Sequence, residues 1–125
     1  MHWSIDYDQT SGFIRVTCEG DFTVDDCISL KKDYLARDFW RPGMDILIDY
    51  RKTKFNNVGL ESIRRIGDFH ISQKDLIGGG KQALLMRTAR DFGLARQYEL
   101  ITEADVPTKI MVFQDESEAL GWLRG

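Results

Sequence analysis

An uninterrupted apolar run, Ile46-Leu47-Ile48, constrains the fold of this chain more than any other feature. Strands with one exposed face alternate polar and apolar residues, whereas a continuous run of branched apolar residues is typical of a strand covered on both faces. We therefore predict a buried strand from Asp45 to Tyr50. A polar turn follows it, and an amphipathic helix begins at Gly59-Leu60. In a sheet flanked by helices, binding sites lie at such strand-to-helix edges.

The other segments predict strands that alternate with helices. Alternation with a period of two residues predicts an opening β-hairpin, and apolar residues at helical spacing predict four helices. Thr23 and Asp115 are expected to cap the first and last helices, and either Thr88 or Asp91 the third. The predicted strands are 3–7, 14–18, 45–50, 82–86 and 109–113, and the predicted helices are 24–38, 60–71, 92–101 and 116–123.

This order, β-β-α-β-α-β-α-β-α, predicts an α/β fold with a mixed, mostly parallel sheet. Parallel neighbours require right-handed crossovers through helices, and the N-terminal β-hairpin adds one antiparallel strand. The length of 125 residues and a hydrophobic content of 42% suit a single domain over residues 1–125.

The charge and cysteine content argue against several classes of function. Seventeen Lys and Arg residues against twenty Asp and Glu leave a net charge of -3, so the chain lacks the positive field that holds nucleic acid. No apolar run approaches the roughly 20 residues of a membrane span, and residues 1–9 lack the features of a signal peptide. Cys18 and Cys27 form no Cys-x-x-Cys pair, which gives no support for a metal or another cofactor and favours the reducing cytoplasm.

Several short motifs accompany this element order. Gly20 precedes the first helix, and Arg41-Pro42-Gly43 precedes the Ile-Leu-Ile-Asp strand. Phe113-Gln114-Asp115-Glu116 leads into Ala119-Leu120-Gly121-Trp122-Leu123 at the end of the chain. Together with Asn56-Asn57-Val58-Gly59-Leu60, these motifs resemble the STAS domain family, and in particular its small uncharacterised bacterial SpoIIAA-like members. The resemblance covers nearly the whole chain and implies the SpoIIAA-like fold of the anti-sigma-factor antagonists.

The family resemblance also implies an interaction surface at the start of the second helix. In the signalling members, a serine at this place is phosphorylated by a partner kinase, and its phosphate controls binding to that partner. The matching positions in this chain are Asn57 and Val58, whose side chains cannot accept a phosphoryl group. The resemblance therefore implies a regulatory protein-interaction module without the phosphorylation switch, held in the form that binds its partner.

Two loops that follow parallel strands carry most of the candidate binding residues, and such loops converge at one edge of the sheet. Each precedes a helix, whose N-terminus offers free backbone N–H groups and partial positive charge. We call the predicted site the cationic corner, and it comprises Arg51, Lys54, Asn56, Asn57, Gly59, Arg87, Thr88 and Arg90. The sequence predicts that this corner binds a protein partner. The alternatives are a small anionic or lipid-like ligand, and solvated loop cations without a ligand.

The sequence supplies no assembled catalytic site. No serine has Gly-x-Ser-x-Gly spacing, and neither cysteine has an evident histidine base. His70 falls on the apolar side of the second helix and is expected to be packed and hydrogen-bonded rather than a ligand. Asp45 and Asp49 share one face of a strand, where a carboxylate more often caps a loop or meets an arginine such as Arg51 than acts as an acid. We therefore expect no enzymatic activity. The third alternative function, after partner binding and ligand binding, is an enzyme whose catalytic residues the sequence does not reveal.

Five aromatic residues exceed the needs of a small core: Trp3, Phe22, Phe39, Trp40 and Phe55. We expect some of them at the surface, where they would mark a partner surface, a homodimer contact or an apolar-ligand pocket. The alternative is that each packs in the core or at its rim.

Overall fold

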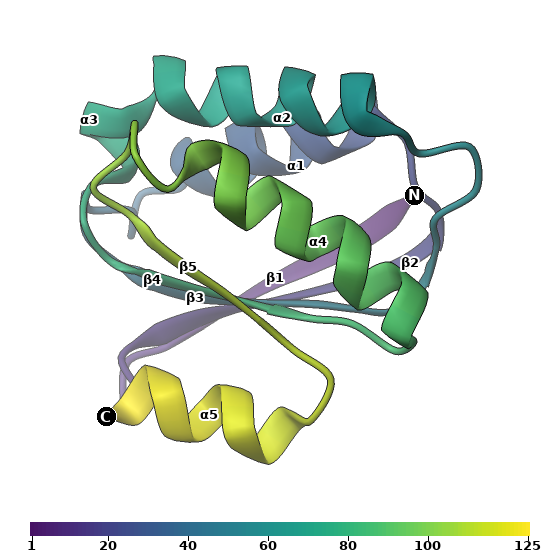
Figure 1. Cartoon of the computed structure of the whole chain (residues 1–125). Helices are drawn as coiled ribbons and strands as arrows, with labels where there is room; N and C mark the ends of the chain where they lie inside the picture. Colours follow the sequence, from purple (N-terminus) through teal and green to yellow (C-terminus); the bar gives the residue numbers. More distant parts are fainter.

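The computed structural model describes all 125 residues and contains one five-stranded sheet with helices on both faces (Figure 1). The strands are β1 (His2–Asp8), β2 (Phe13–Asp21), β3 (Asp45–Lys54), β4 (Lys81–Leu85) and β5 (Lys109–Phe113). They follow one another across the sheet in chain order. The first pair is antiparallel and the remaining pairs are parallel. The predicted α/β sheet with its opening hairpin is confirmed.

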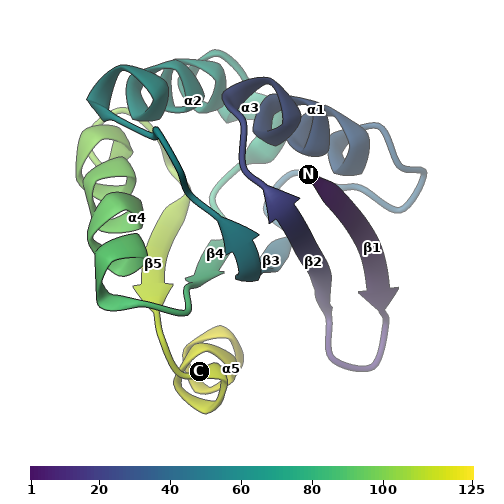
Figure 2. The same cartoon turned by 90° about the vertical axis from the view of Figure 1, so that its right-hand side faces the viewer.

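Helices cover the two faces of this sheet unequally. They are α1 (Val24–Leu35), α2 (Leu60–Ser72), α3 (Lys74–Ile77), α4 (Ala89–Thr102) and α5 (Glu116–Arg124). Helices α1, α2 and α4 lie together on one face, which we call the three-helix face (Figures 1 and 2). Helix α5 lies alone on the other, the α5 face. The short helix α3, which follows α2, is the one helix that the sequence does not predict.

Side-chain caps begin three of the helices, as the sequence predicts. The side chains of Thr23, Thr88 and Asp115 each accept a hydrogen bond from the backbone N–H three residues later, at 3.1 Å. Of the two candidates for α4, Thr88 is therefore the cap. Helix α2 begins after Gly59 without a side-chain cap, so no side chain occupies the free N–H groups of its first turn.

Helix α1 ends earlier than the sequence predicts, at Leu35 rather than near Asp38. The chain turns there and brings Trp40 to α3, where the indole N–H donates a hydrogen bond to the Leu76 carbonyl at 2.9 Å. The local apolar pattern does not contain this contact with a distant segment.

Strand β3 is buried on both faces, as its continuous apolar run predicts. Ile46 and Ile48 pack in the larger hydrophobic cluster under the three-helix face, and Leu47 packs in the smaller cluster under α5. The strand continues past Tyr50 to Lys54, beyond its predicted end, because β2 continues to pair with it. The turn from β3 to α2 is therefore short and runs over residues 55–59.

The Gly78-Gly79-Gly80 segment joins α3 to β4 and packs against another part of the backbone. A Cβ atom on Gly80 would lie 2.5 Å from the carbonyl oxygens of Gly43 and Met44, closer than real side chains approach. Only glycine fits this position, because the two backbone segments touch. With Lys81 after it, this glycine run resembles a phosphate loop in composition. The segment follows a helix and enters a strand, however, whereas a phosphate loop follows a strand and opens a helix.

Most of the aromatic residues considered for the surface are buried. Phe22, Trp40 and Phe55 are 8%, 8% and 6% exposed, so the alternative of core packing is confirmed for these three. Trp3 and Phe39 are partly buried and pack against the same core. The loops that carry Phe22 and Phe55 fold the two rings inward, where their centroids lie 4.8 Å apart. The extra aromatic surface therefore packs under the three-helix face.

Candidate functional site

The turn from β3 to α2 is exposed at the carboxyl edge of the parallel strands. Asn56, Asn57, Gly59 and Leu60 are all exposed, and 49% of the Leu60 surface is accessible. Asn57 has a φ of 58°, in the left-handed region that asparagine tolerates better than most residues. The turn therefore presents two amide side chains and one apolar side chain to solvent.

The loop from β4 to α4 lies beside this turn. The Arg90 guanidinium donates a hydrogen bond to the Phe55 carbonyl at 3.1 Å, which ties the N-terminus of α4 to the turn. Lys54 and Arg87 are exposed and form no ion pair. The structure thus brings seven of the predicted residues to one edge: Lys54, Asn56, Asn57, Gly59, Arg87, Thr88 and Arg90.

Arg51 lies apart from this group, because its side chain is on the α5 face. Its guanidinium donates hydrogen bonds to Asp49 Oδ2 at 2.8 Å and Glu116 Oε1 at 3.0 Å. Arg15 meets the same two carboxylates, at 3.7 Å from Asp49 Oδ2 and in direct contact with Glu116. Residues two apart in a strand share a face, so Arg51 lies beside Asp49 rather than beside the turn. We call these four residues the α5-face ion network. Arg51 therefore belongs to this network and not, as the sequence predicted, to the cationic corner.

The carboxylates of β3 have structural partners. Burial raises the pKa of Asp49, but hydrogen bonds from the side chain and backbone of Arg51 outweigh it and hold the pKa below its ordinary value. Asp45 Oδ1 accepts a hydrogen bond from the Lys81 backbone N–H at 2.8 Å and so joins β3 to β4. The predicted arginine partner of Asp49 is confirmed, whereas Asp45 contacts the first residue of β4 rather than a loop. Asp49 is ionised at neutral pH, whereas a general acid needs a raised pKa.

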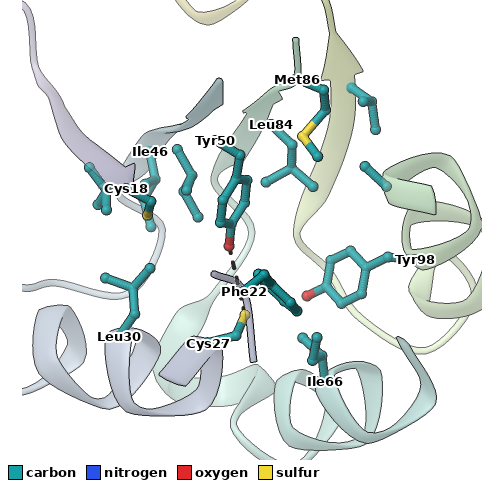
Figure 3. Close-up of a cluster of buried hydrophobic side chains, with 14 of the residues drawn as sticks. Cys18, Phe22, Cys27, Leu30, Ile46, Tyr50, Ile66, Leu84, Met86 and Tyr98 are labelled. Atoms are coloured by element: carbon teal, nitrogen blue, oxygen red, sulfur yellow. Dashed lines mark hydrogen bonds between the residues drawn. The ribbon is translucent and has the colours of Figure 1, made fainter. Parts of the chain in front are cut away.

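An apolar cavity of about 60 Å³ lies beneath the exposed turn, between the sheet and helices α1, α2 and α4. Its aromatic walls include Phe22, Tyr50 and Tyr98. Figure 3 shows these rings converging, with the Tyr50 hydroxyl 3.7 Å from the Cys27 sulfur. All the lining side chains are hydrophobic except Lys31.

Lys31 is a buried cation without a counter-charge. Only 2% of its surface is accessible, its Nζ lies 5.6 Å from the centroid of the Tyr98 ring, and no carboxylate pairs with it. Burial opposes the charge of Lys31, whereas the hydroxyl dipole of Tyr98 beside the amine favours it. Burial also raises the pKa of Tyr98 to about 12, and those of Tyr34 and Cys27. These neighbours are therefore neutral at pH 7 and offer Lys31 dipoles only.

Comparisons with known proteins bear on the fold. A scan against protein-family models found no match, and a search of curated proteins found no similar sequence. Among solved structures, an uncharacterised protein of the DUF3478 family with a SpoIIAA-like fold, from Shewanella loihica PV-4, matches with a TM-score of 0.60 at 17% sequence identity. The match covers 98% of this chain and 92% of that chain. This chain has the SpoIIAA-like fold.

The SpoIIAA-like fold is the one that the family resemblance in the sequence implies. A likeness at 17% identity carries the architecture and leaves function to the residues of the site. No helix in the structure combines the length and the apolar character needed to cross a membrane. The structure also gathers no three His, Cys, Asp or Glu residues that could hold a metal ion.

In this SpoIIAA-like chain, His70 links the cavity wall to the far end of β5. Its Nδ1 lies 2.8 Å from the Tyr98 hydroxyl, and its Nε2 lies 3.0 Å from the Thr108 hydroxyl. Thr108 donates to the Gly78 carbonyl at 2.6 Å, so it accepts from Nε2–H, and Nδ1 accepts from Tyr98. Burial, and secondly the charge of Lys31, lower the pKa of His70 to about 3. The prediction of a packed, hydrogen-bonded histidine is confirmed.

Sequence reasoning missed Lys31, although a signal was present. Lys31 lies four residues after Cys27 and three before Tyr34, which is the spacing of one helix face. Both neighbours belong to the predicted apolar stripe of α1, so the lysine falls within that stripe. Lysines in such places usually extend their amine to solvent, and the spacing alone therefore does not predict burial.

Proposed function

We propose that this SpoIIAA-like chain is a non-catalytic, regulatory protein-interaction module of the bacterial cytoplasm. The observation that carries the proposal is the exposed turn, where Leu60 offers an apolar side chain beside two amides. An apolar anchor surrounded by polar groups is typical of protein interfaces. Lys54, Arg87 and Arg90 add positive charge, so an acidic partner surface fits best. The two cysteines are free and buried, which suits a reducing compartment.

The proposed surface acts without a phosphorylation switch at position 57. Asn57 and Val58 carry no hydroxyl group, so partner binding at this turn is constitutive. An Asn57→Asp substitution introduces a negative charge among the corner cations and facing an acidic partner, and it should weaken the complex. Unchanged affinity of the purified pair after this substitution would argue against the turn as the interface.

Photo-cross-linking in living cells tests the proposed surface. A photoreactive amino acid at position 57 should form a covalent adduct with a partner, whereas the same amino acid at the exposed Glu118 of α5 should not. Arg87→Glu should remove the adduct. The matched Lys109→Glu, at an exposed position on the opposite edge of the sheet, should leave it. Equal adduct yields at both positions, or an adduct insensitive to Arg87→Glu, would contradict the proposal.

Binding of a small anionic or lipid-like ligand is the second candidate, and the apolar cavity favours it. The corner cations do not line this cavity, and the charge available inside it belongs to Lys31. A ligand with an apolar part would therefore bind beneath the turn, under the helices, rather than between the loops.

A further inference from the structure

Lys31 places a positive charge in an apolar cavity without a negative charge to meet it. Moving an ammonium ion out of water is strongly unfavourable unless a counter-ion or a set of dipoles compensates it. The hydroxyls of Tyr34 and Tyr98 supply dipoles, and the rest of the wall is hydrophobic. A single negative charge inside the cavity would therefore be stabilised more strongly here than at an exposed lysine, because solvent screens it less.

We propose that this cavity binds a short aliphatic carboxylate, with its oxygens on the Lys31 ammonium and its hydrocarbon chain against Phe55, Ile66 and Leu94. The inference deepens the second candidate function and does not require a protein partner. The ammonium donates charge-assisted hydrogen bonds to the carboxylate. The hydrophobic wall favours a hydrocarbon chain over water. The carboxylate and the hydrocarbon chain of the ligand are thus each complementary to the side chains that they would contact.

The composition of the wall separates this ligand from other classes. A phosphate dianion or a nucleotide requires several donors, and the cavity offers one ammonium among hydrophobic side chains. A metal ion or an amine would be repelled by Lys31. A neutral hydrocarbon would fit the wall but leave the lysine charge uncompensated. The wall therefore favours a monoanion with an apolar chain.

The size and the mouth of the cavity limit the ligand further. Its volume is about 60 Å³, whereas a cavity of about 150 Å³ accommodates benzene, so the ligand should have fewer heavy atoms than the six of benzene. Val58 and Leu94 line the cavity and are half-buried, so they mark its approach to solvent. The hydrogen bond from Arg90 to the Phe55 carbonyl holds the turn over this side.

Parallel NMR titrations of the 125-residue chain with propionate and with propionamide test the inference. The two compounds have nearly the same shape, and only propionate is charged. We expect propionate to bind at least about tenfold more tightly and to shift the amide signals of Phe55, Val58 and Leu94. Lys31→Met should abolish this preference and still bind propionamide. Lys32→Met, at the exposed neighbour on the same helix, should leave both affinities unchanged.

A second variant separates the cavity from adventitious surface binding. Ala95→Leu fills the cavity and keeps Lys31, so it should abolish binding of both compounds, with the fold of each variant checked by its NMR spectrum. Equal affinity for propionate and propionamide, no binding of either, or propionate binding that survives Lys31→Met would overturn the proposal. These outcomes would leave the protein-interaction proposal standing, because its surface lies outside the cavity.

Discussion

The two faces of the sheet place positive charge in opposite surroundings. On the α5 face, the partly exposed Arg15 and Arg51 meet two carboxylates, Asp49 and Glu116. On the three-helix face, the buried Lys31 meets none. Water solvates Arg15 and Arg51 and is largely excluded from Lys31. The ion pairs of this molecule thus lie where such pairs contribute little to stability, and the unpaired charge lies where it is most unfavourable.

The difference between the two faces indicates which charged residue has a structural role and which one calls for a functional explanation. The α5-face ion network joins β2 and β3 to the start of α5, so its geometry explains its presence as a structural feature. Lys31 joins no elements through an ion pair, and stability alone does not explain a charge in its position. The carboxylate ligand proposed above would explain it. Four measurements test this contrast between the two faces, from the largest expected effect to the smallest.

Acidification should destabilise the three-helix face first, through His70. Its pKa is lowered from an ordinary 6.5 to about 3 by burial and by Lys31. The unfolded chain takes up a proton below 6.5 and the folded chain does not until about 3, so the free energy of unfolding falls as the pH drops through this window. The slope reaches about 1.4 kcal/mol per pH unit. Urea denaturation at a series of pH values measures it.

The α5-face ion network responds only below about pH 4.5, where its window overlaps the lower part of that of His70. The pKa of Glu116 is lowered from 4.5 by Arg15 and that of Asp49 from 3.8, so their stabilisation is present above these values and is lost as the pH falls toward the folded pKa. Between 6.5 and 4.5 the slope should therefore depend on His70, and His70→Gln should flatten it. A slope that persists in this variant would assign the acid sensitivity to another group.

Lys31→Met should raise the free energy of unfolding by about 1–4 kcal/mol, because a buried charge is replaced by an apolar side chain of similar length. The matched control is the exposed Lys32, where the same substitution should change stability by less than about 0.5 kcal/mol. Chemical denaturation compares the two variants. A loss of stability with Lys31→Met larger than that of the control would show that the tyrosine dipoles more than compensate the buried charge.

Asp49→Asn should lower the free energy of unfolding by about 1–2 kcal/mol. The substitution removes the charge from a carboxylate that accepts three hydrogen bonds from Arg51 and lies near Arg15. The exposed Asp6, on an edge strand and outside any ion pair, provides the control, and Asp6→Asn should be silent in the same denaturation experiment. Equal effects at both positions would remove the structural role assigned to the network.

Glu116→Gln should have the smallest effect, below about 1 kcal/mol, because the side chain is exposed enough for solvent to screen its pairs with Arg15 and Arg51. High salt should reduce this difference further. Glu118→Gln, on the same helix and outside any ion pair, is the reference. If Glu116→Gln cost as much as Asp49→Asn in high salt, the contrast between exposed and buried charge on this face would be wrong.

Most of the fold could be predicted from the sequence because its signals are local. The continuous run at Ile46-Leu47-Ile48 predicts a strand covered twice, and the caps at Thr23 and Asp115 predict where α1 and α5 begin, whereas for α4 Thr88 was one of two candidates. The end of α1 and the existence of α3 could not be predicted in this way. Both lie near the hydrogen bond from the Trp40 side chain to the Leu76 carbonyl, a contact between segments far apart in the chain that local patterns do not contain.

A smaller part of the candidate site than of the fold could be predicted from the sequence. The strand-to-helix loops did converge, since parallel strands place their carboxyl ends at one edge. Arg51 was assigned to those loops by its position in the chain, although the alternation of β3 already placed it on the face of Asp49. Lys31 lay within the apolar stripe of α1, but only the surrounding helices remove its ammonium group from water.

The sequence by itself determined the alternation of strands and helices, the starts of α1 and α5 and the double burial of β3, because each follows from periodicity or capping within a few residues. Only the tertiary structure decided which cations are compensated. The stability of a charge depends on the carboxylates, dipoles and water around it, and distant segments supply all three. Arg51 therefore gained its partners, and Lys31 its cavity, when the chain folded.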